Sequence, residues 1–305
     1  MPELPDIELY LHALRPRLVG RAVDRIRLAS PFLVRTTTPD IQTLVGRTVV
    51  GIRRLGKRVV FEFDGPYLVI HLMIAGRFQW RPPNAPIPRR LGLLAIDAGD
   101  GTLLLTEAGT TRRAAAHVLP DAAALEAMDP GGLEVLTATV EQFRQALVRE
   151  RHTLKRTLTD PGLFSGIGNA YSDEILHRAR LSPARMSDAL TSGEVAALYD
   201  AVRAVLCEWR DTLIAEAGEA FPAKVTAFRD GMAAHGRYGR PCPVCGAPIQ
   251  RLRYAANEAN YCPTCQTDGR LLADRGLSRL LKSDWPRSLE ELERRMSSYR
   301  GRGPD

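Results

Sequence analysis

Met1-Pro2-Glu3-Leu4-Pro5-Asp6 opens the chain, and the rest of the sequence can be interpreted outward from this stretch. If the initiator methionine is removed, Pro2 provides a free secondary amine, which can attack a sugar carbon and form an iminium. Glu3 is adjacent and can transfer protons to and from the same sugar. The alternative is a frayed chain end in which the proline has no role. Two distant segments decide between these interpretations.

The first of these segments contains four of the five cysteines, in two closely spaced pairs: Cys242 with Cys245, and Cys262 with Cys265. Each Cys-x-x-Cys turn can present two thiolates to one metal ion, and two such turns complete a tetrahedral site around a β-hairpin. Because four protein ligands leave no open position, we expect one structural Zn²⁺ per chain in a zinc ribbon. Unliganded core cysteines would not explain the paired spacing. The fifth cysteine, Cys207, is interpreted as a buried helix residue.

The second segment is a glycine-rich turn, Gly166-Ile167-Gly168-Asn169, which precedes a predicted helix over residues 170–178. Glycines permit backbone conformations that are closed to other residues. The exposed amides at the start of a helix form a natural binding site for a phosphate. The alternative is a plain helix start at which Asn169 is the cap.

Together with the Pro2-Glu3 start, these segments resemble the Fpg/Nei family of DNA glycosylases, formamidopyrimidine-DNA glycosylase and endonuclease VIII. The resemblance covers residues 2–270, and the chain resembles a divergent bacterial-type member. It implies a helix-two-turn-helix motif in which Asn169 binds the phosphate flanking a lesion and Lys155 is a second phosphate ligand. It also implies that Lys57 reaches a phosphate beside the damaged nucleotide and is needed for activity. Without the resemblance, both lysines would be interpreted as solvated.

The sequence departs from the family pattern in the residues that fill the gap left by a flipped-out base. The family uses a methionine after a His-Leu-Gly strand end, and an arginine and a phenylalanine in a later loop. Here Met73 is displaced by one position and Ile74 takes its place, so we expect one of these two to enter the gap. The later loop retains Arg112, expected to contact DNA, but has Ala114 in place of the phenylalanine.

A second departure lies in the zinc ribbon. The family arginine that grips a phosphate five residues before the third cysteine is Asn257 in this chain. Arg251, within the ribbon hairpin, and Arg270, after it, are expected to contact DNA phosphates instead, which fixes register without reading sequence.

The composition fits a soluble protein with a polyanionic partner. The 305 residues carry a net charge of +7 with a pI of about 9.4. Residues 236–305 hold 13 Lys and Arg against 8 Asp and Glu, so most of the excess lies in the last quarter. An apolar run of about 18 residues is missing, which predicts no membrane span. The charged N-terminus lacks a signal-peptide core, which predicts a cytoplasmic, nucleoid-associated protein. We also expect a monomer.

Periodicity predicts an α+β multidomain fold. Residues 6–15 show an amphipathic helical pattern that Pro16 is expected to end. Residues 23–107 contain short apolar runs with turn residues between them, as in a β-sandwich. Helical periodicity follows over residues 139–218, and residues 288–293 form a short tail helix. The predicted domains are an N-terminal catalytic β-sandwich domain (1–121), a linker (122–136), a helix-two-turn-helix DNA-binding domain (137–235), a zinc-ribbon module (236–270) and a C-terminal tail (271–305).

The sequence therefore predicts a base-excision-repair DNA glycosylase/AP lyase that acts on double-stranded DNA containing damaged bases or abasic sites. It would remove oxidised bases and cleave the strand by β,δ-elimination through a Pro2 Schiff base, without an organic cofactor. Oxidised purines and, as for endonuclease VIII, oxidised pyrimidines are both left open as substrates. A non-catalytic damaged-DNA-binding protein on the same scaffold would require a blocked or misplaced Pro2. A tautomerase with an N-terminal proline would leave the glycine-asparagine segment and the cysteines unexplained.

Overall fold

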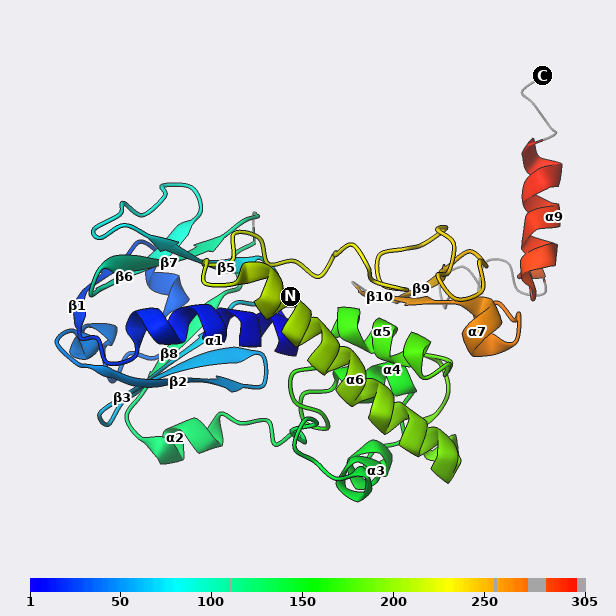
Figure 1. The fold of residues 1–305 in the computed structure, drawn as a ribbon, viewed down its shortest axis with the longest axis horizontal. Helices are drawn as coiled ribbons and strands as arrows, with labels where there is room; N and C mark the ends of the chain where they lie inside the picture. The colour runs from blue at the N-terminus through cyan, green and yellow to red at the C-terminus, as the bar shows by residue number, and fades with distance from the viewer. Residues whose placement is uncertain (110, 255–256, 274–283, 301–305) are drawn as a thin grey trace. The chain divides into compact units, whose positions relative to one another are not determined.

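The structure is a computed structural model that describes the chain except for residues 110, 255–256, 274–283 and 301–305 (Figure 1). It contains two compact units. The first consists of Met1–Glu134, Ser165–Ile167 and Leu206–Ala227, and the second of Val135–Phe164, Gly168–Val205 and Phe228–Asp305.

The first unit is built on two antiparallel four-stranded sheets, with strand orders β1-β6-β7-β5 and β2-β3-β4-β8. The strands are β1 (Val23–Leu28), β2 (Val49–Leu55), β3 (Arg58–Phe63), β4 (Tyr67–His71), β5 (Gly76–Arg81), β6 (Gly92–Ala98), β7 (Gly101–Glu107) and β8 (Ala115–Leu119). Two short 3-10 helices, η1 (Pro31–Leu33) and η2 (Ile41–Leu44), lie between β1 and β2 in the chain. The predicted β-sandwich is confirmed, and β8 is an additional strand that the apolar pattern did not indicate.

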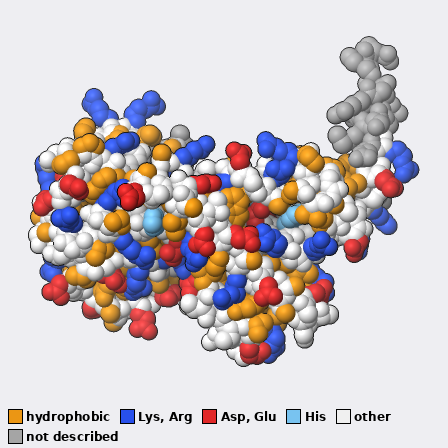
Figure 2. Space-filling view, in the orientation of Figure 1, with side chains coloured by type: hydrophobic (Ala, Val, Ile, Leu, Met, Phe, Trp, Pro, Cys, Tyr) orange, Lys and Arg blue, Asp and Glu red, His pale blue; other side chains and the backbone are white. Residues whose placement is uncertain are grey.

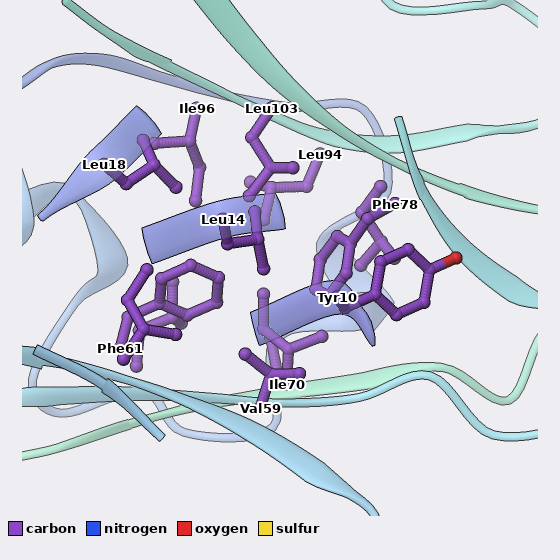
Figure 3. Packing of buried hydrophobic residues seen from close by; sticks show 14 of the residues in the cluster. Tyr10, Leu14, Leu18, Val59, Phe61, Ile70, Phe78, Leu94, Ile96 and Leu103 are labelled. Atoms are coloured by element: carbon purple, nitrogen blue, oxygen red, sulfur yellow. The ribbon is translucent and has the colours of Figure 1, made fainter. Parts of the chain in front are cut away.

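Helix α1 (Leu4–Leu18) fills the core of this unit. Figure 3 shows Leu14 of the helix between Leu94 and Leu103 on one side and Val59 and Ile70 on the other. All of these side chains are at most 2% exposed. Their removal from water is the dominant favourable contribution to folding of the unit.

Helix α1 is longer than the sequence predicted, and the expectation that Pro16 would end it is wrong. Pro5 suits the first turn, where the missing N–H would be unpaired in any case. Pro16 lies in the last turn, and its missing N–H costs one backbone hydrogen bond. Leu18 is only 1% exposed, so burial of its side chain favours continuing the helix beyond the proline.

The predicted linker is not wholly irregular, because it contains helix α2 (Ala122–Ala127). Asp121 caps this helix, and its side chain accepts a hydrogen bond of 2.8 Å from the Ala124 N–H. An N-cap aspartate before an alanine-rich run is a helix start signal. The sequence interpretation gave more weight to the turn residues that follow, at 129–132.

The second unit is helical and ends in the cysteine module. Its elements are α3 (Val140–Val148), α4 (Leu154–Thr159), α5 (Asn169–Arg178), η3 (Ser187–Ala189), the first half of α6 (Ser192–Ala217), the hairpin β9 (Gln250–Tyr254) and β10 (Asn257–Tyr261), α7 (Pro263–Thr267) and α9 (Leu289–Arg300). The helices predicted from periodicity are confirmed, and α9 includes most of the predicted tail helix.

Helix α6 continues from the second unit into the first, so the unit boundaries differ from the predicted domain range 137–235. Leu213 and Val225 belong to the core that surrounds α1, and Trp209 packs against that core. The apolar stripe of α6 is therefore shared between two cores, which periodicity alone does not reveal. Cys207 lies on this helix but is half-buried, so the prediction that it is buried is wrong.

Hydrogen bonds connect the residues that follow the ribbon to the ribbon and to the start of the tail helix. The Leu271 N–H donates to the Arg287 carbonyl at 3.0 Å, and the Leu272 N–H donates to the Tyr261 hydroxyl oxygen at 2.8 Å. Tyr261 is 1% exposed, and burial raises the pKa of its hydroxyl to about 12. These bonds place the start of α9 beside the ribbon.

Candidate functional site

The first residues of the chain are packed and are not a frayed end. Pro2 is buried, Glu3 is 2% exposed and Asp6 is fully buried. The Glu3 N–H donates to the Asp6 carboxylate at 2.9 Å, as half of a capping box at the start of α1. The Leu4 N–H donates to the Gly166 carbonyl at 2.9 Å. The Pro2-Glu3 start is thus held by the glycine-rich segment, 162 residues further along the sequence.

Lys57 reaches the same segment from the turn between β2 and β3. Gly56 supplies a positive φ of 60° in that turn. The Lys57 ammonium donates to the Ile167 carbonyl at 2.8 Å. Burial is the main cause that lowers the pKa of Lys57 below its ordinary value, and the nearby Glu3 carboxylate opposes this. Glu3 and Lys57, separated by 54 positions in sequence, are therefore close enough to interact electrostatically.

The α-amino group at the start of the chain shares this environment. Burial lowers the pKa of the Met1 amine below its ordinary value, while the carboxylates of Glu3 and Asp6 act in the opposite direction. The side chains of Arg77 and Lys57 lower it further. A lowered pKa increases the fraction of neutral amine, and only the neutral amine is nucleophilic.

Arg54 holds this region together, and sequence reasoning missed it. Its side chain is 8% exposed and donates to the Gly56 carbonyl at 2.9 Å and to the Ser165 hydroxyl at 3.1 Å. It also forms ion pairs with Glu8 and Glu134. Its partners are distant in sequence, so no local pattern indicates this role.

His71, at the end of β4, is a second residue that sequence reasoning missed. It pairs across the sheet with Arg58, and burial lowers the pKa of its imidazole to about 4, aided by the charges of Arg58 and Lys57. Its Nε2 is buried and has no hydrogen-bond partner among the described residues. The imidazole is therefore neutral at pH 7.

The two candidates for the base gap differ in exposure. Met73 is half-buried with a positive φ of 52°, whereas Ile74 is 59% exposed. Arg77 donates to the Ile74 carbonyl at 3.1 Å and fixes the turn between β4 and β5. Ile74 is therefore the residue that offers an apolar side chain to solvent.

The later loop has a different arrangement. Arg112 is exposed, and its guanidinium donates to the Arg90 carbonyl at 2.6 Å. Ala114 is only 4% exposed, and its N–H donates to the buried Glu107 carboxylate at 3.1 Å. The position at which the family has phenylalanine thus carries a buried methyl group that is directed into the protein core.

In the second unit, Lys155 and Asn169 lie side by side. Asn169 is the first residue of α5 and Gly168 is the N-cap, so the interpretation of Asn169 as a cap is wrong. Lys155, on α4, is 3% exposed. Its ammonium donates to the Asn169 carbonyl at 2.6 Å and to the Asp173 carboxylate at 2.5 Å.

The four paired cysteines form one cluster, with their sulfur atoms within 4.8 Å of one another. Cys245 and Cys262 sulfurs are 3.4 Å apart, and those of Cys242 and Cys265 are 4.0 Å apart. A tetrahedral site with Zn–S bonds of about 2.3 Å requires sulfur separations of roughly 3.8 Å. The cluster fits one structural zinc ion, held by four thiolates.

The ribbon arginines have different surroundings. The Arg251 guanidinium lies 4.1 Å from the centre of the Tyr238 ring and 3.8 Å from the Glu258 carboxylate. Arg270 is exposed, and its carbonyl accepts a hydrogen bond from Thr267. Asn257 is the first residue of β10 and pairs with Tyr254.

Charged side chains of both signs are interspersed on the face of the protein seen in Figure 2, with Lys and Arg in blue and Asp and Glu in red. In the described part of the chain, every helix is too short or too polar to cross a membrane.

Comparison with known proteins accounts for this set of features. The model of the Formamidopyrimidine-DNA glycosylase N-terminal domain matches residues 1–108, and that of the Formamidopyrimidine-DNA glycosylase H2TH domain matches residues 130–210. The zinc finger found in FPG and IleRS matches residues 239–267.

Relatives match over nearly their whole length. The formamidopyrimidine-DNA glycosylase of Roseiflexus sp. (strain RS-1) is 34% identical over 276 residues, which cover 87% of this chain and 100% of the relative. That of Thermus thermophilus is 32% identical and covers 88% of this chain and 100% of the relative.

Two solved structures have similar folds. Lactococcus lactis Fpg in complex with DNA that contains an abasic site has a TM-score of 0.76 at 26% identity, covering 87% of this chain and 99% of the other. The same protein with DNA that contains an oxidised pyrimidine also has a TM-score of 0.76 at 26% identity, covering 87% and 100%. The chain belongs to the Fpg/Nei family of DNA glycosylases, the enzymes of base excision repair that remove damaged bases.

Proposed function

We propose that this DNA glycosylase is also an AP lyase and that the Pro2 nitrogen is its nucleophile. The observation that carries the proposal is the convergence of Pro2-Glu3 and Lys57 on the Gly166-Ile167 backbone. A chain end that served no purpose would not require two hydrogen bonds to one distant segment and burial of two carboxylates.

The chemistry starts once Met1 has been removed. The neutral Pro2 nitrogen attacks C1′ of the damaged nucleotide, the bond from C1′ to the base breaks, and the base leaves with a proton. Glu3 protonates the ring oxygen, which opens the sugar and gives an iminium between C1′ and the Pro2 nitrogen.

Strand cleavage follows from the charge of the iminium. It acidifies the C2′ proton, and loss of this proton expels the 3′ phosphate oxygen in β-elimination. Loss of the C4′ proton then expels the 5′ phosphate oxygen in δ-elimination. Hydrolysis of the remaining Schiff base releases the sugar fragment and restores Pro2.

DNA is held by cations and by the end of a helix. Lys57 binds phosphate on the first unit, and Lys155 and Asn169 bind phosphate on the second. Arg112, Arg251 and Arg270 contribute further contacts to the DNA backbone. The exposed Ile74 enters the gap left by the flipped base in preference to the half-buried Met73.

Borohydride trapping tests the nucleophile. The purified protein, with Met1 removal verified by mass spectrometry, is incubated with a duplex that contains one abasic site and is then reduced. We expect a covalent complex whose cross-link maps to Pro2, and loss of most base excision with Pro2→Gly at matched DNA binding. If the wild type binds DNA but yields no complex, the protein is a non-catalytic damaged-DNA-binding protein.

Lesion choice is tested with the same protein. Excision is measured on matched duplexes that differ only in carrying an oxidised purine or an oxidised pyrimidine. We expect activity on both, because Ala114 leaves out the bulky phenylalanine that would contact the opposite strand. A preference of more than about 100-fold, which is about 2.7 kcal/mol of transition-state binding, would contradict this.

A further inference from the structure

A buried carboxylate in the second unit connects three separate segments. Asp173, on α5, is 1% exposed and accepts from the Lys155 ammonium at 2.5 Å. It also contacts the His235 Nδ1 at 2.8 Å and accepts from the Asn260 side-chain amide at 3.2 Å. Lys155 lies on α4, His235 precedes the ribbon, and Asn260 lies on the ribbon strand β10. One side chain thus joins the lysine to the zinc module.

Neighbouring contacts connect helix α5 to the ribbon and to the segment that precedes it. Asn169, Asp173 and His177 are four residues apart, so they lie on one face of α5. The His177 Nε2 is 3.2 Å from the Cys242 sulfur. Glu174 accepts hydrogen bonds of 2.7–2.8 Å from three consecutive backbone amides at 233–235. Helix α5 is therefore hydrogen-bonded both to the ribbon and to the segment that precedes it.

The Lys155 ammonium has one donor left over. An ammonium has three N–H donors. In the described part of the chain, Lys155 uses one on the Asn169 carbonyl and one on Asp173. Its side chain is only 4% exposed, so the two acceptors restrict the direction of the third N–H. A buried charge requires a counter-charge, and Asp173 supplies it.

We infer that Asp173 is a positioning residue that aims the third N–H of Lys155 at a DNA phosphate, and that the zinc ribbon sets the position of this carboxylate through Asn260. This inference rests on the proposed role of Lys155 as a phosphate ligand. The zinc module then serves two purposes. It carries its own arginines, and it fixes the phosphate-binding end of the helical unit.

The test combines protein variants with neutralised phosphates. Binding is measured at one fixed salt concentration for an abasic-analogue duplex and for a series in which single phosphates near the lesion are replaced by neutral methylphosphonate. The variants are Asp173→Asn, Asn260→Ala and Lys155→Met. Asp188→Asn is the matched control, because Asp188 is an exposed carboxylate of the same unit that pairs with Arg151. Zinc content and circular dichroism confirm that each variant is folded.

One methylphosphonate position should weaken the wild type by about 10–100-fold, the value of a charge-assisted hydrogen bond. Lys155→Met and Asp173→Asn should bind the unmodified duplex more weakly than the wild type does, by a similar factor. Neutralising that phosphate should then have little further effect on their affinity. Asn260→Ala should show the same pattern to a smaller extent, and it carries the test if Asp173→Asn does not fold. The control should behave as wild type.

Three other outcomes are distinguishable. Asp173→Asn could weaken binding to the unmodified duplex and still lose as much affinity as the wild type when that phosphate is neutralised. Asp173 would then be merely structural, and the inference would be wrong. If Lys155→Met keeps the wild-type affinity and the wild-type response to every methylphosphonate, Lys155 is not a phosphate ligand, and the proposed function fails at this residue. If Asn260→Ala matches the wild type, the ribbon does not set the position of Asp173.

Discussion

Replacing Gly166 by alanine should displace the proposed nucleophile, Pro2, from the segment that supports it. Gly166 has a φ of +80°, and a Cβ built there would lie 2.9 Å from the Leu4 Cβ and 3.0 Å from an Arg54 nitrogen. The Arg54 guanidinium is the end of a flexible side chain and can move. The Leu4 Cβ cannot move without α1, because Leu4 is fully buried and its N–H is bonded to the Gly166 carbonyl.

The cost has two parts that a control can separate. The left-handed conformation costs an alanine roughly 1–2 kcal/mol. The contact with Leu4 adds roughly 1–3 kcal/mol of overpacking. Gly20 has a φ of +81° in the same unit, with nothing within 4 Å of its built Cβ. Gly20→Ala therefore carries the first cost alone, and the difference between the two variants measures the contact with the start of α1.

The assay compares thermal unfolding and borohydride trapping for the two variants. At roughly 2–4 °C per kcal/mol, Gly166→Ala should unfold about 2–12 °C below Gly20→Ala. Trapping at 25 °C, where both variants are folded, should be slower for Gly166→Ala by at least about 10-fold, because a shift of the nucleophile by even 1 Å can cost far more than that. Equal unfolding temperatures and equal trapping rates would refute the idea that Gly166 positions the N-terminus.

Two further predictions concern pH and zinc. Because the folded pKa of His71 is about 4, below the ordinary 6.5, the unfolded chain binds the proton first as the pH falls from 6.5 to 4. The free energy of unfolding of the wild type should decrease over that window by an amount on the order of 3 kcal/mol. Urea titrations at pH 7 and 4 should give a smaller decrease for His71→Gln. An equal decrease for the two proteins would contradict the assignment to His71. Cys262→Ser should lose zinc and weaken DNA binding, while Cys207→Ser, the control outside the cluster, should keep one zinc per chain by atomic absorption. Zinc retained by Cys262→Ser would refute the four-thiolate site.

The sequence predicted those parts of the site whose residues lie close together in the chain. Two Cys-x-x-Cys turns bring four sulfurs within 4.8 Å because each turn already orients two of them. The turn before α5 was visible because glycines mark unusual backbone conformations, and Gly166 has a positive φ. Lys57 was identified through the family resemblance, because a lysine at a hairpin tip would otherwise be interpreted as solvated.

The parts that the sequence did not predict depend on contacts between distant segments. Arg54 is one of two adjacent arginines in β2, and only the fold brings Ser165 and Glu134 to it. Asp173 has the pattern of an ordinary helix residue, and its partners His235 and Asn260 follow 62 and 87 positions later. The same limit explains α6, whose second half belongs to the core around α1. Local periodicity identifies a buried face but not the core that buries it.

The site offers two amines, the Lys57 side chain and, once Met1 is removed, the Pro2 nitrogen, and this raises the question of which is the nucleophile. Burial is the main cause that lowers the pKa of Lys57 and that of the Met1 amine, which precedes Pro2. The Lys57 ammonium donates to the Ile167 carbonyl, an arrangement that suits a fixed cation beside a phosphate. Pro2 is a secondary amine, so its adduct with C1′ is an iminium that stays charged and cannot become neutral by losing a proton from nitrogen. A permanent charge favours both eliminations, and on this ground we propose that Pro2 carries out the covalent step and that Lys57 binds the phosphate. A cross-link mapped to Lys57 in the trapping experiment would reverse the assignment.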